Sequence, residues 1–237
     1  MLIDIAPSPL SAGQAADILL LPGRAAFMAA SATLLVSDLH LGKAAAFRSA
    51  GIPVPEGSAQ ADLARLERLV RETAARRLIV LGDLFHARSG CTAEVFAEFA
   101  AARARMPATE VILVAGNHDR AIGRIPASLG IDSCMRSHDE PPFHFVHDPA
   151  TGLTEPGRTC FTVAGHLHPT LSIAVPGGDR ITGRCFVAQA SLLVLPAFGS
   201  FTGGHRVEVA ADTRLWIARD DGVADVSAIA RLAASRR

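Results

Sequence analysis

The sequence is poor in aromatic residues and in lysine, and its charges cancel. Aromatic residues make up 5% of the 237 residues and hydrophobic residues 49%, so a core has to be built from Ala, Val, Leu and Ile. Lys43 is the only lysine, and the formal net charge is zero. A zero net charge argues against a strongly electrostatic polyanion binder, whose affinity would come mostly from neutralising phosphates. It does not exclude a local basic groove.

Paired cysteines and membrane-length apolar runs are also missing. Cys91, Cys134, Cys160 and Cys185 are widely scattered, without Cys-x-x-Cys spacing, and no signal peptide is recognisable. We therefore expect reduced cysteines that serve in packing, in a cytoplasmic protein. No apolar run approaches the span of a bilayer, so no membrane partner is expected. No segment resembles a linker, which predicts a single domain over residues 1–237.

One pattern recurs along the chain: a branched apolar run that ends in residues able to bind a metal. It is clearest where Leu78 to Leu81 runs into Gly82 and Asp83, as a buried parallel strand does when it delivers a carboxylate to the edge of a sheet. The pattern returns before Asp38-Leu39-His40, before Gly116-Asn117-His118-Asp119 and before Gly165-His166-Leu167-His168. Ligands gather outside the carboxyl ends of the strands in open α/β sheets. We therefore expect one metal centre, with Asp83 bridging two ions.

The order of the predicted elements indicates an α/β protein. Strands near 33–37, 78–81 and 111–115 alternate with helices that Ser58 and Thr92 would cap, which predicts a parallel half-sheet with covering helices. The segment 41–57 is too irregular for a regular element and is predicted to be a loop that contacts substrate. Beyond residue 120 the pattern is mostly that of strands. Two sheets packed face to face with outer helices would satisfy both halves.

The candidate ligands combine oxygen and nitrogen donors without thiolates. Such a set suits manganese, iron or zinc in a catalytic site. Asp38 and His40, two apart in an extended chain, would project to the same side and hold one ion. Two ions about 3.5–4 Å apart can clamp the attacking and leaving oxygens in phosphoryl displacement. The first ion could take Asp38, His40, Asp83 and one of His166 and His168, and the second could take Asp83, Asn117, His147 and the other.

Asp-x-His and Gly-Asp are weak signals alone, because an aspartate after a strand is a routine helix cap, and the histidine pair can be a surface turn. Gly116-Asn117-His118-Asp119 is moderately specific, because three polar residues behind a buried strand are costly unless they bind something. The ordered set of Asp38-x-His40, Gly82-Asp83, Gly116-Asn117-His118-Asp119, a lone histidine and Gly165-His166-x-His168 resembles the calcineurin-like metallophosphoesterases. That resemblance implies a four-layer α/β/β/α sandwich. It also implies one metal on Asp38, His40, Asp83 and His168, and another on Asp83, Asn117, His147 and His166.

Longer stretches resemble particular branches of that family. Gly82-Asp83-Leu84-Phe85-His86 is similar to the SbcD-type repair nucleases, which implies that His86 faces substrate. Ser37 to Lys43, Gly51 to Pro55 and Leu195 to Gly199 resemble the ligase-associated DNA damage response endonucleases of the PdeM type. The resemblance implies a DNA endonuclease in DNA repair, with a ligase or helicase as a possible partner.

Catalytic roles follow for residues beside the ligands. His118 would be unligated near the scissile phosphate, where it stabilises charge or protonates the leaving oxygen while Asp119 orients its ring. Lys43, Arg48, Arg88 and Arg120 lie near ligand positions and could contact phosphates. Mn²⁺ is the expected metal, with Zn²⁺ or Fe as alternatives, because Mg²⁺ prefers oxygen ligands.

Two alternatives stay open. The family usually has His-Gly at the lone histidine, whereas this chain has His147-Asp148, so His144 is a rival ligand. A phosphatase or pyrophosphatase acting on a small nucleotide or a lipid precursor is the rival function, and the neutral net charge tolerates it better.

Overall fold

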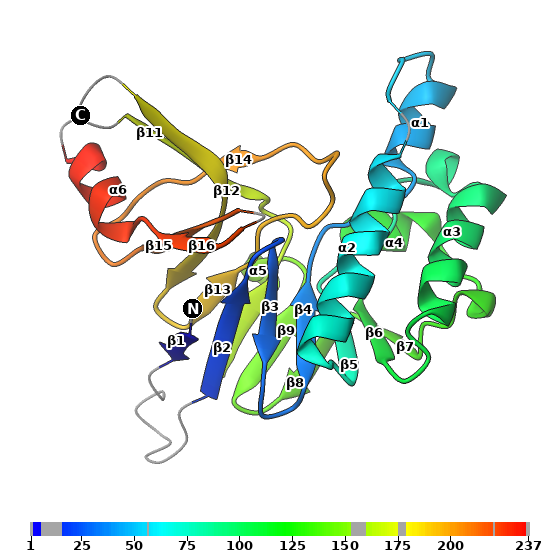
Figure 1. Ribbon diagram of the computed structural model, residues 1–237, viewed down its shortest axis with the longest axis horizontal. Helices are drawn as coiled ribbons and strands as arrows, with labels where there is room; N and C mark the ends of the chain where they lie inside the picture. Colours follow the sequence, from blue (N-terminus) through cyan, green and yellow to red (C-terminus); the bar gives the residue numbers. More distant parts are fainter. Residues whose placement is uncertain are drawn as a thin grey trace.

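Two β-sheets packed face to face form the centre of this computed structural model, and helices lie outside them (Figure 1). The structure describes residues 2–5, 16–55, 57–152, 160–174, 179–219 and 221–235. None of the helices within these ranges is both long and apolar enough to cross a membrane.

The first sheet has its strands in chain order, from β1 to β7. They are β1 (Leu2–Ile5), β2 (Ala16–Leu21), β3 (Ala25–Met28), β4 (Thr33–Val36), β5 (Arg77–Val80), β6 (Glu110–Val114) and β7 (Ser133–Met135). Strands β1 to β4 pair antiparallel, and β4 to β7 pair parallel. The helices α2 (Ser58–Thr73) and α3 (Ala93–Ala104) make the crossovers between the parallel strands. The carboxyl ends of β4, β5 and β6 therefore lie along one edge.

The second sheet has the order β14-β11-β12-β13-β10-β9-β8, with β15 paired to β12 and β16 to β15. Its strands are β8 (Ser137–Glu140), β9 (Phe143–Val146), β10 (Phe161–Ala164), β11 (Pro169–Ala174), β12 (Arg180–Gln189), β13 (Leu192–Val194), β14 (His205–Arg206), β15 (Arg214–Ala218) and β16 (Val223–Asp225). Strand β10 is parallel to both β9 and β13. The carboxyl ends of β9 and β10 thus share an edge as well.

The parallel strands β4, β5 and β6 at the centre of the first sheet are buried on both faces. In β4, Leu34 and Val36 pack under the helices, whereas Leu35 between them packs against the second sheet, as the two-residue period of a strand requires. On the far side, Ala230 of α6 (Ser227–Ala234) packs on Leu215 of β15. The order of layers is helix, sheet, sheet, helix, which confirms the predicted four-layer α/β/β/α sandwich.

Two local predictions were wrong. Within the segment 41–57, predicted to be a loop, residues Lys43–Ser49 form α1; three consecutive alanines favour helix there. Gly57 rather than Ser58 is the N-cap of α2. The prediction for Thr92 is confirmed, because its hydroxyl accepts a hydrogen bond from the Val95 amide at 3.4 Å. The remaining elements are η1 (Arg88–Gly90), α4 (Asn117–Ile122), η2 (Ala127–Leu129) and α5 (Pro149–Gly152).

The cysteines are all unpaired, as the sequence predicted, but they do not all serve in packing. Cys185 is buried, whereas Cys134 is exposed. Burial raises the pKa of the Cys185 thiol to about 12, so this thiol is unreactive in the folded protein.

Candidate metal centre

The seven candidate ligands come from five strand ends and meet where the two sheets present their carboxyl edges. Asp38 and His40 follow β4, Asp83 follows β5, Asn117 follows β6, His147 follows β9, and His166 and His168 follow β10. Strand pairing within each sheet, together with the packing of the two sheets, therefore explains why residues more than a hundred positions apart in sequence are neighbours.

The first group joins Asp38, His40 and His168, whose ligand atoms lie within 4.8 Å of one another. His168 Nε2 is 3.2 Å from Asp38 Oδ1 and 3.2 Å from His40 Nε2. Asp38 is fully buried, and its Oδ1 has no hydrogen-bond partner among the described residues. Such a buried carboxylate oxygen is costly unless it is paired. Two imidazole nitrogens that face each other beside it fit a shared cation.

The second group joins Asp83, His147 and His166. His147 Nε2 is 3.0 Å from Asn117 Oδ1, 3.0 Å from His166 Nδ1 and 3.5 Å from Asp83 Oδ2. The other ring nitrogen, His147 Nδ1, lies 2.9 Å from the carbonyl of Leu81. This nitrogen therefore carries the proton and donates, which leaves the lone pair on Nε2 directed at the group, as in metal-bound histidines.

Asp83 lies between the two groups. Its Oδ2 is 3.5 Å from His147 Nε2 and 3.8 Å from His40 Nε2, so one oxygen faces both. Its Oδ1 accepts a hydrogen bond from the His118 amide at 2.9 Å. Burial raises the pKa of Asp83, although His147 lowers it. A cation at this oxygen would stabilise the ionised carboxylate. The donor set and this position fit two divalent ions that share Asp83.

Five of the candidate ligands have left-handed backbones. The φ angles are 54° at Asp38, 50° at His40, 49° at Asp83, 68° at His166 and 44° at His168. Residues other than glycine rarely adopt this region, and strain of this kind clusters at functional sites. The prediction that Asp38 and His40 converge because the chain is extended was therefore wrong. Both residues instead reach the group from backbones with positive φ.

Three glycines make room for the ligands. A Cβ at Gly82 would lie 2.1 Å from His147 Nδ1, and one at Gly116 would lie 2.1 Å from Asp83 Oδ1. A Cβ at Gly165 would lie 2.8 Å from Asp38 Oδ2. In each of these three motifs, the glycine thus leaves space for a candidate ligand that follows another strand.

His118 and His86 form a stacked pair at the rim of the centre. Their ring centroids are 4.8 Å apart, with planes inclined by 25°. His118 Nδ1 contacts the carbonyl oxygen of His86, which leaves Nε2, 4.0 Å from Asp83 Oδ2, as the free nitrogen. His86 Nδ1 lies 3.3 Å from His40 Nδ1. His40, His86 and His118 could also hold an ion by distance alone.

Asp119 does not orient the His118 ring, contrary to the sequence-based interpretation. Its buried carboxylate accepts hydrogen bonds from the amides of Gly116 and Phe85, each at 3.0 Å. It therefore ties the loop after β6 to the loop after β5. The His86 carbonyl is what holds the imidazole of His118, so Asp119 supports the site through the backbone.

The imidazoles of His40 and His86 are neutral near pH 7. Burial, and then the neighbouring His168, lowers the pKa of His40 from 6.5 to about 2. Burial followed by His118 lowers the pKa of His86 to about 4. Neutral imidazole is the form that donates a lone pair to a metal.

His144, the rival ligand, lies apart from both groups. It is in β9 opposite Asp139 of β8, and its Nδ1 is 2.6 Å from Asp139 Oδ1. Its neighbours Phe143 and Phe145 face the space between the sheets. His144 and His147 border a hollow of about 330 Å³ that Arg120 and Arg136 also line.

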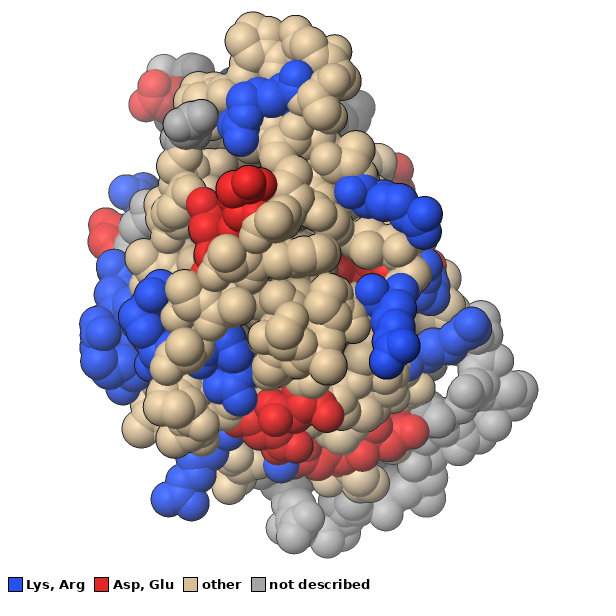
Figure 2. All heavy atoms as spheres, turned by 90° about the vertical axis from the view of Figure 1, so that its right-hand side faces the viewer, with Lys and Arg blue, Asp and Glu red and all other residues tan. Residues whose placement is uncertain are grey.

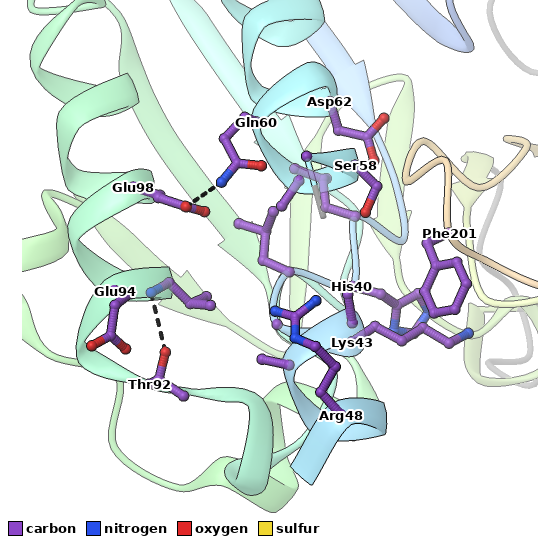
Figure 3. Close-up of a pocket in the computed structure, with 18 residues that line it drawn as sticks. His40, Lys43, Arg48, Ser58, Gln60, Asp62, Thr92, Glu94, Glu98 and Phe201 are labelled. Carbon is purple, nitrogen blue, oxygen red and sulfur yellow. Dashed lines mark hydrogen bonds between the residues drawn. The ribbon is translucent and has the colours of Figure 1, made fainter. Parts of the chain in front are cut away.

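The candidate phosphate-contacting cations are divided between two sides of the centre. Lys43 and Arg48 line a pocket of about 380 Å³ that also contains His40 (Figure 3). Arg88 donates to the carbonyl of Ile122 at 3.2 Å, and Arg120 donates to that of Ala115 at 2.7 Å. Basic and acidic side chains are interspersed over the described atoms of the face in Figure 2. Lys and Arg gather at the two sides of that face, and acidic side chains lie between and below them.

Sequence reasoning missed Arg184 and Phe201. The Arg184 side chain donates to the carbonyls of Ala197, Ser200 and Thr202, each at 2.9 Å. Phe201 lines the same pocket as His40. Neither residue belongs to a local motif, and only the position of Phe201 just after the Leu195-to-Gly199 stretch could have pointed to it.

A mixed oxygen and nitrogen donor set at the carboxyl edge of a four-layer sandwich defines a metal-dependent hydrolase. The family model of calcineurin-like phosphoesterases matches residues 32–183. The chain therefore belongs to the calcineurin-like phosphoesterase family and is a metal-dependent phosphoesterase.

Solved structures resemble the chain to different degrees. The Pseudomonas putida nuclease MPE is 37% identical with a TM-score of 0.73, and the match covers 89% of this chain and 95% of that one. AQ665 from Aquifex aeolicus, of unknown function, is 19% identical with a TM-score of 0.37, over 57% of this chain and 78% of that one. YfcE, a phosphoesterase from E. coli, is 15% identical with a TM-score of 0.40, over 82% of this chain and 98% of that one. No curated protein matched the chain.

Proposed function

We propose that this protein is a two-metal phosphodiesterase that cleaves DNA. The observation that carries the proposal is the position of Asp83 Oδ2, which faces an imidazole of each candidate group, at 3.5 Å for His147 and 3.8 Å for His40. The similarity to a bacterial nuclease over 89% of the chain supports a nucleic acid as the substrate.

Two sets of residues would hold the ions. The first set is Asp38, His40, Asp83 and His168, and the second is Asp83, Asn117, His147 and His166. Imidazole-rich sets favour Mn²⁺ over Mg²⁺, with Zn²⁺ or Fe as alternatives. When bound, two such ions polarise the phosphoryl oxygens and lower the pKa of a water so that hydroxide is available near neutral pH.

The residues around the ions supply orientation and protons. His118 Nδ1 is engaged by the His86 carbonyl, so Nε2 is the atom that meets the substrate. At this place His118 protonates the leaving oxygen or stabilises the charge that develops on the phosphate. His86 supports the His118 ring by stacking and faces the substrate beside it. Lys43 lines the pocket that His40 borders and attracts a phosphate there.

We also propose a biological role, a cellular location and a domain organisation. The stretches that resemble PdeM-type endonucleases support a role in DNA repair, with a ligase or helicase as a partner. The unpaired cysteines agree with a cytoplasmic location. We take residues 1–237 as one domain because the candidate site draws its ligands from both sheets.

A panel of metals and substrates tests the proposal. Chelated protein is given Mn²⁺, Mg²⁺ or Zn²⁺ together with linear DNA, circular DNA, RNA, bis-p-nitrophenyl phosphate or a cyclic nucleotide. Cleavage of DNA with Mn²⁺ is the expected result, and cuts in circular DNA would identify an endonuclease. Hydrolysis of only small phosphate esters would instead favour the rival phosphatase or pyrophosphatase, which the zero net charge accommodates.

A further inference from the structure

A row of aromatic rings leads from the metal centre to the surface. His118 stacks on His86, Phe47 of α1 lies 6.4 Å from His86 between ring centroids, and Phe201 lies 5.6 Å from Phe47. Phe201 belongs to the connection between β13 and β14 and is 36% exposed. A single exposed aromatic ring is ordinary on a protein surface. What matters here is how the ring is held and what it borders.

The segment that carries Phe201 is fixed by two charged side chains, those of Arg184 and Asp62. Arg184 donates to the carbonyls of Ser200 and Thr202 on either side of Phe201, each at 2.9 Å. Asp62, which is buried in α2, accepts a hydrogen bond from the Ser200 amide at 2.6 Å. An exposed apolar ring on a rigid support can bind a partner without the cost of ordering the support.

The ring borders the pocket of about 380 Å³ beside the metal centre. His40 is part of its wall, and the Lys43 ammonium lies 5.9 Å from the centre of the Phe201 ring. Figure 3 shows Phe201, Lys43 and His40 at one end and the carboxylates of Glu94 and Glu98 at the other. The acidic end repels a sugar–phosphate backbone, whereas Lys43 attracts one. Lys43 and Arg48 in the same pocket offer charges for a phosphate, whereas the Phe201 ring beside Lys43 offers an apolar surface for a flat group such as a nucleobase.

We propose that Phe201 stacks on a nucleobase next to the scissile phosphate, at one end of the pocket that α1 and the N-terminal parts of α2 and α3 line. This inference rests on the proposed nuclease function and names the part of the nucleotide that this pocket binds. The protein has no net charge, so stacking replaces part of the affinity that basic nucleases obtain from phosphate contacts. Base stacking on an aromatic side chain contributes roughly 5- to 150-fold in affinity per base.

The experiment combines a protein change with a substrate change. An oligonucleotide with one mapped cut receives an abasic residue at each position flanking the cut in turn, and kcat/KM is measured with Mn²⁺. At one flanking position the wild-type protein should lose roughly 5- to 150-fold. Phe201→Ala should show a similar loss on the intact oligonucleotide and almost no further loss on the abasic one. Phe201→Trp should retain the sensitivity of the wild-type protein to the abasic position.

Two comparisons make the result specific. Leu232→Ala removes another exposed apolar side chain, on α6 at the opposite end of the molecule, and should match the wild-type protein throughout (Figure 1). For Phe201→Ala, the loss on the oligonucleotide should exceed the loss on bis-p-nitrophenyl phosphate, which has no base, by at least about 5-fold.

Different failures point to different errors. If the wild-type protein cleaves the oligonucleotide but Phe201→Ala keeps the full abasic penalty, stacking on Phe201 is refuted and the nuclease proposal stands. Equal losses on both substrates would likewise refute a base-binding role. A wild-type protein that hydrolyses only the small ester would refute the nuclease proposal itself, and the inference with it.

Discussion

Replacing Gly116 with alanine tests whether the position of the Asp83 carboxylate controls metal binding. The new Cβ would lie 2.1 Å from Asp83 Oδ1 and 2.5 Å from the Asp83 amide nitrogen, whereas real contacts of this kind almost never fall below 3.0 Å. Gly116 has a φ of −76°, so alanine suits its backbone and the effect is purely steric. The Asp83 backbone is held by the bond from the His40 amide to its carbonyl, at 2.8 Å. The carboxylate therefore has to move by about 1 Å, and the backbone at position 116 or 83 has to shift with it because the amide nitrogen is also too close.

A displacement of that size has two separable consequences. Misplacing a catalytic group by about 1 Å costs on the order of 10²-fold in rate, so we expect a loss of that order with Mn²⁺ and weaker metal binding. Overpacking costs about 1–3 kcal/mol in the free energy of unfolding. Gly203→Ala is the matched control, because a Cβ there meets nothing within 4 Å.

Three measurements separate the effects in Gly116→Ala and Gly203→Ala. Hydrolysis of bis-p-nitrophenyl phosphate reports activity, metal content after gel filtration reports binding, and thermal unfolding in chelator reports stability without metal. The reasoning would be refuted if Gly116→Ala folded, bound two ions and turned over like Gly203→Ala. If Gly116→Ala lost stability but kept normal activity below its unfolding temperature, the activity would not depend on the present position of the Asp83 carboxylate.

Three further predictions concern the individual histidines and the metal. His147→Ala should remove one ion and most activity. His144→Ala breaks the pair with Asp139 and should mainly lower the unfolding temperature. If His144→Ala lost the ion and the activity and His147→Ala kept them, His144 would be the ligand. His118→Ala should lower turnover ~10²–10⁴-fold with both ions bound, and less on p-nitrophenyl esters if His118 protonates the leaving oxygen; a lost ion in metal analysis would make it a ligand. Chelated protein should regain activity with Mn²⁺ and not with Mg²⁺, and full recovery with Mg²⁺ alone in the same assay would contradict the imidazole-rich ligand set.

The sequence predicted the sheet core and the meeting of the candidate ligands for a simple physical reason. Runs such as Leu34 to Val36 and Leu78 to Val80 are apolar without alternation, which predicts strands buried on both faces. Parallel strands present their carboxyl ends at one edge, so polar residues that follow such runs have to converge. The register of the strands and the course of the crossovers set the details, but these polar residues converge in any case.

The local geometry of the site could not be predicted in the same way. Asp38 and His40 have left-handed backbones although neither is glycine. That conformation is held from outside the segment. The Asp38 amide donates a hydrogen bond to the backbone carbonyl of Gly82 at 3.0 Å, and the His40 amide donates one to the backbone carbonyl of Asp83 at 2.8 Å. Tertiary contacts of this kind leave no trace in the local sequence. The same applies to Asp119, whose carboxylate caps backbone amides instead of holding a ring.

The two buried aspartates show how the fold prepares the site for cations. Each uses one oxygen to accept a backbone amide from another loop: Asp38 Oδ2 accepts from His166 and Asp83 Oδ1 accepts from His118, at 3.0 and 2.9 Å. Each directs its other oxygen at imidazole nitrogens, 3.2 Å away for Asp38 and 3.5 Å away for Asp83. The amide bonds fix the carboxylates, and one of them crosses from the first sheet to the second. The hydrogen bonds from the other loops therefore help to position the oxygens that a cation would bind.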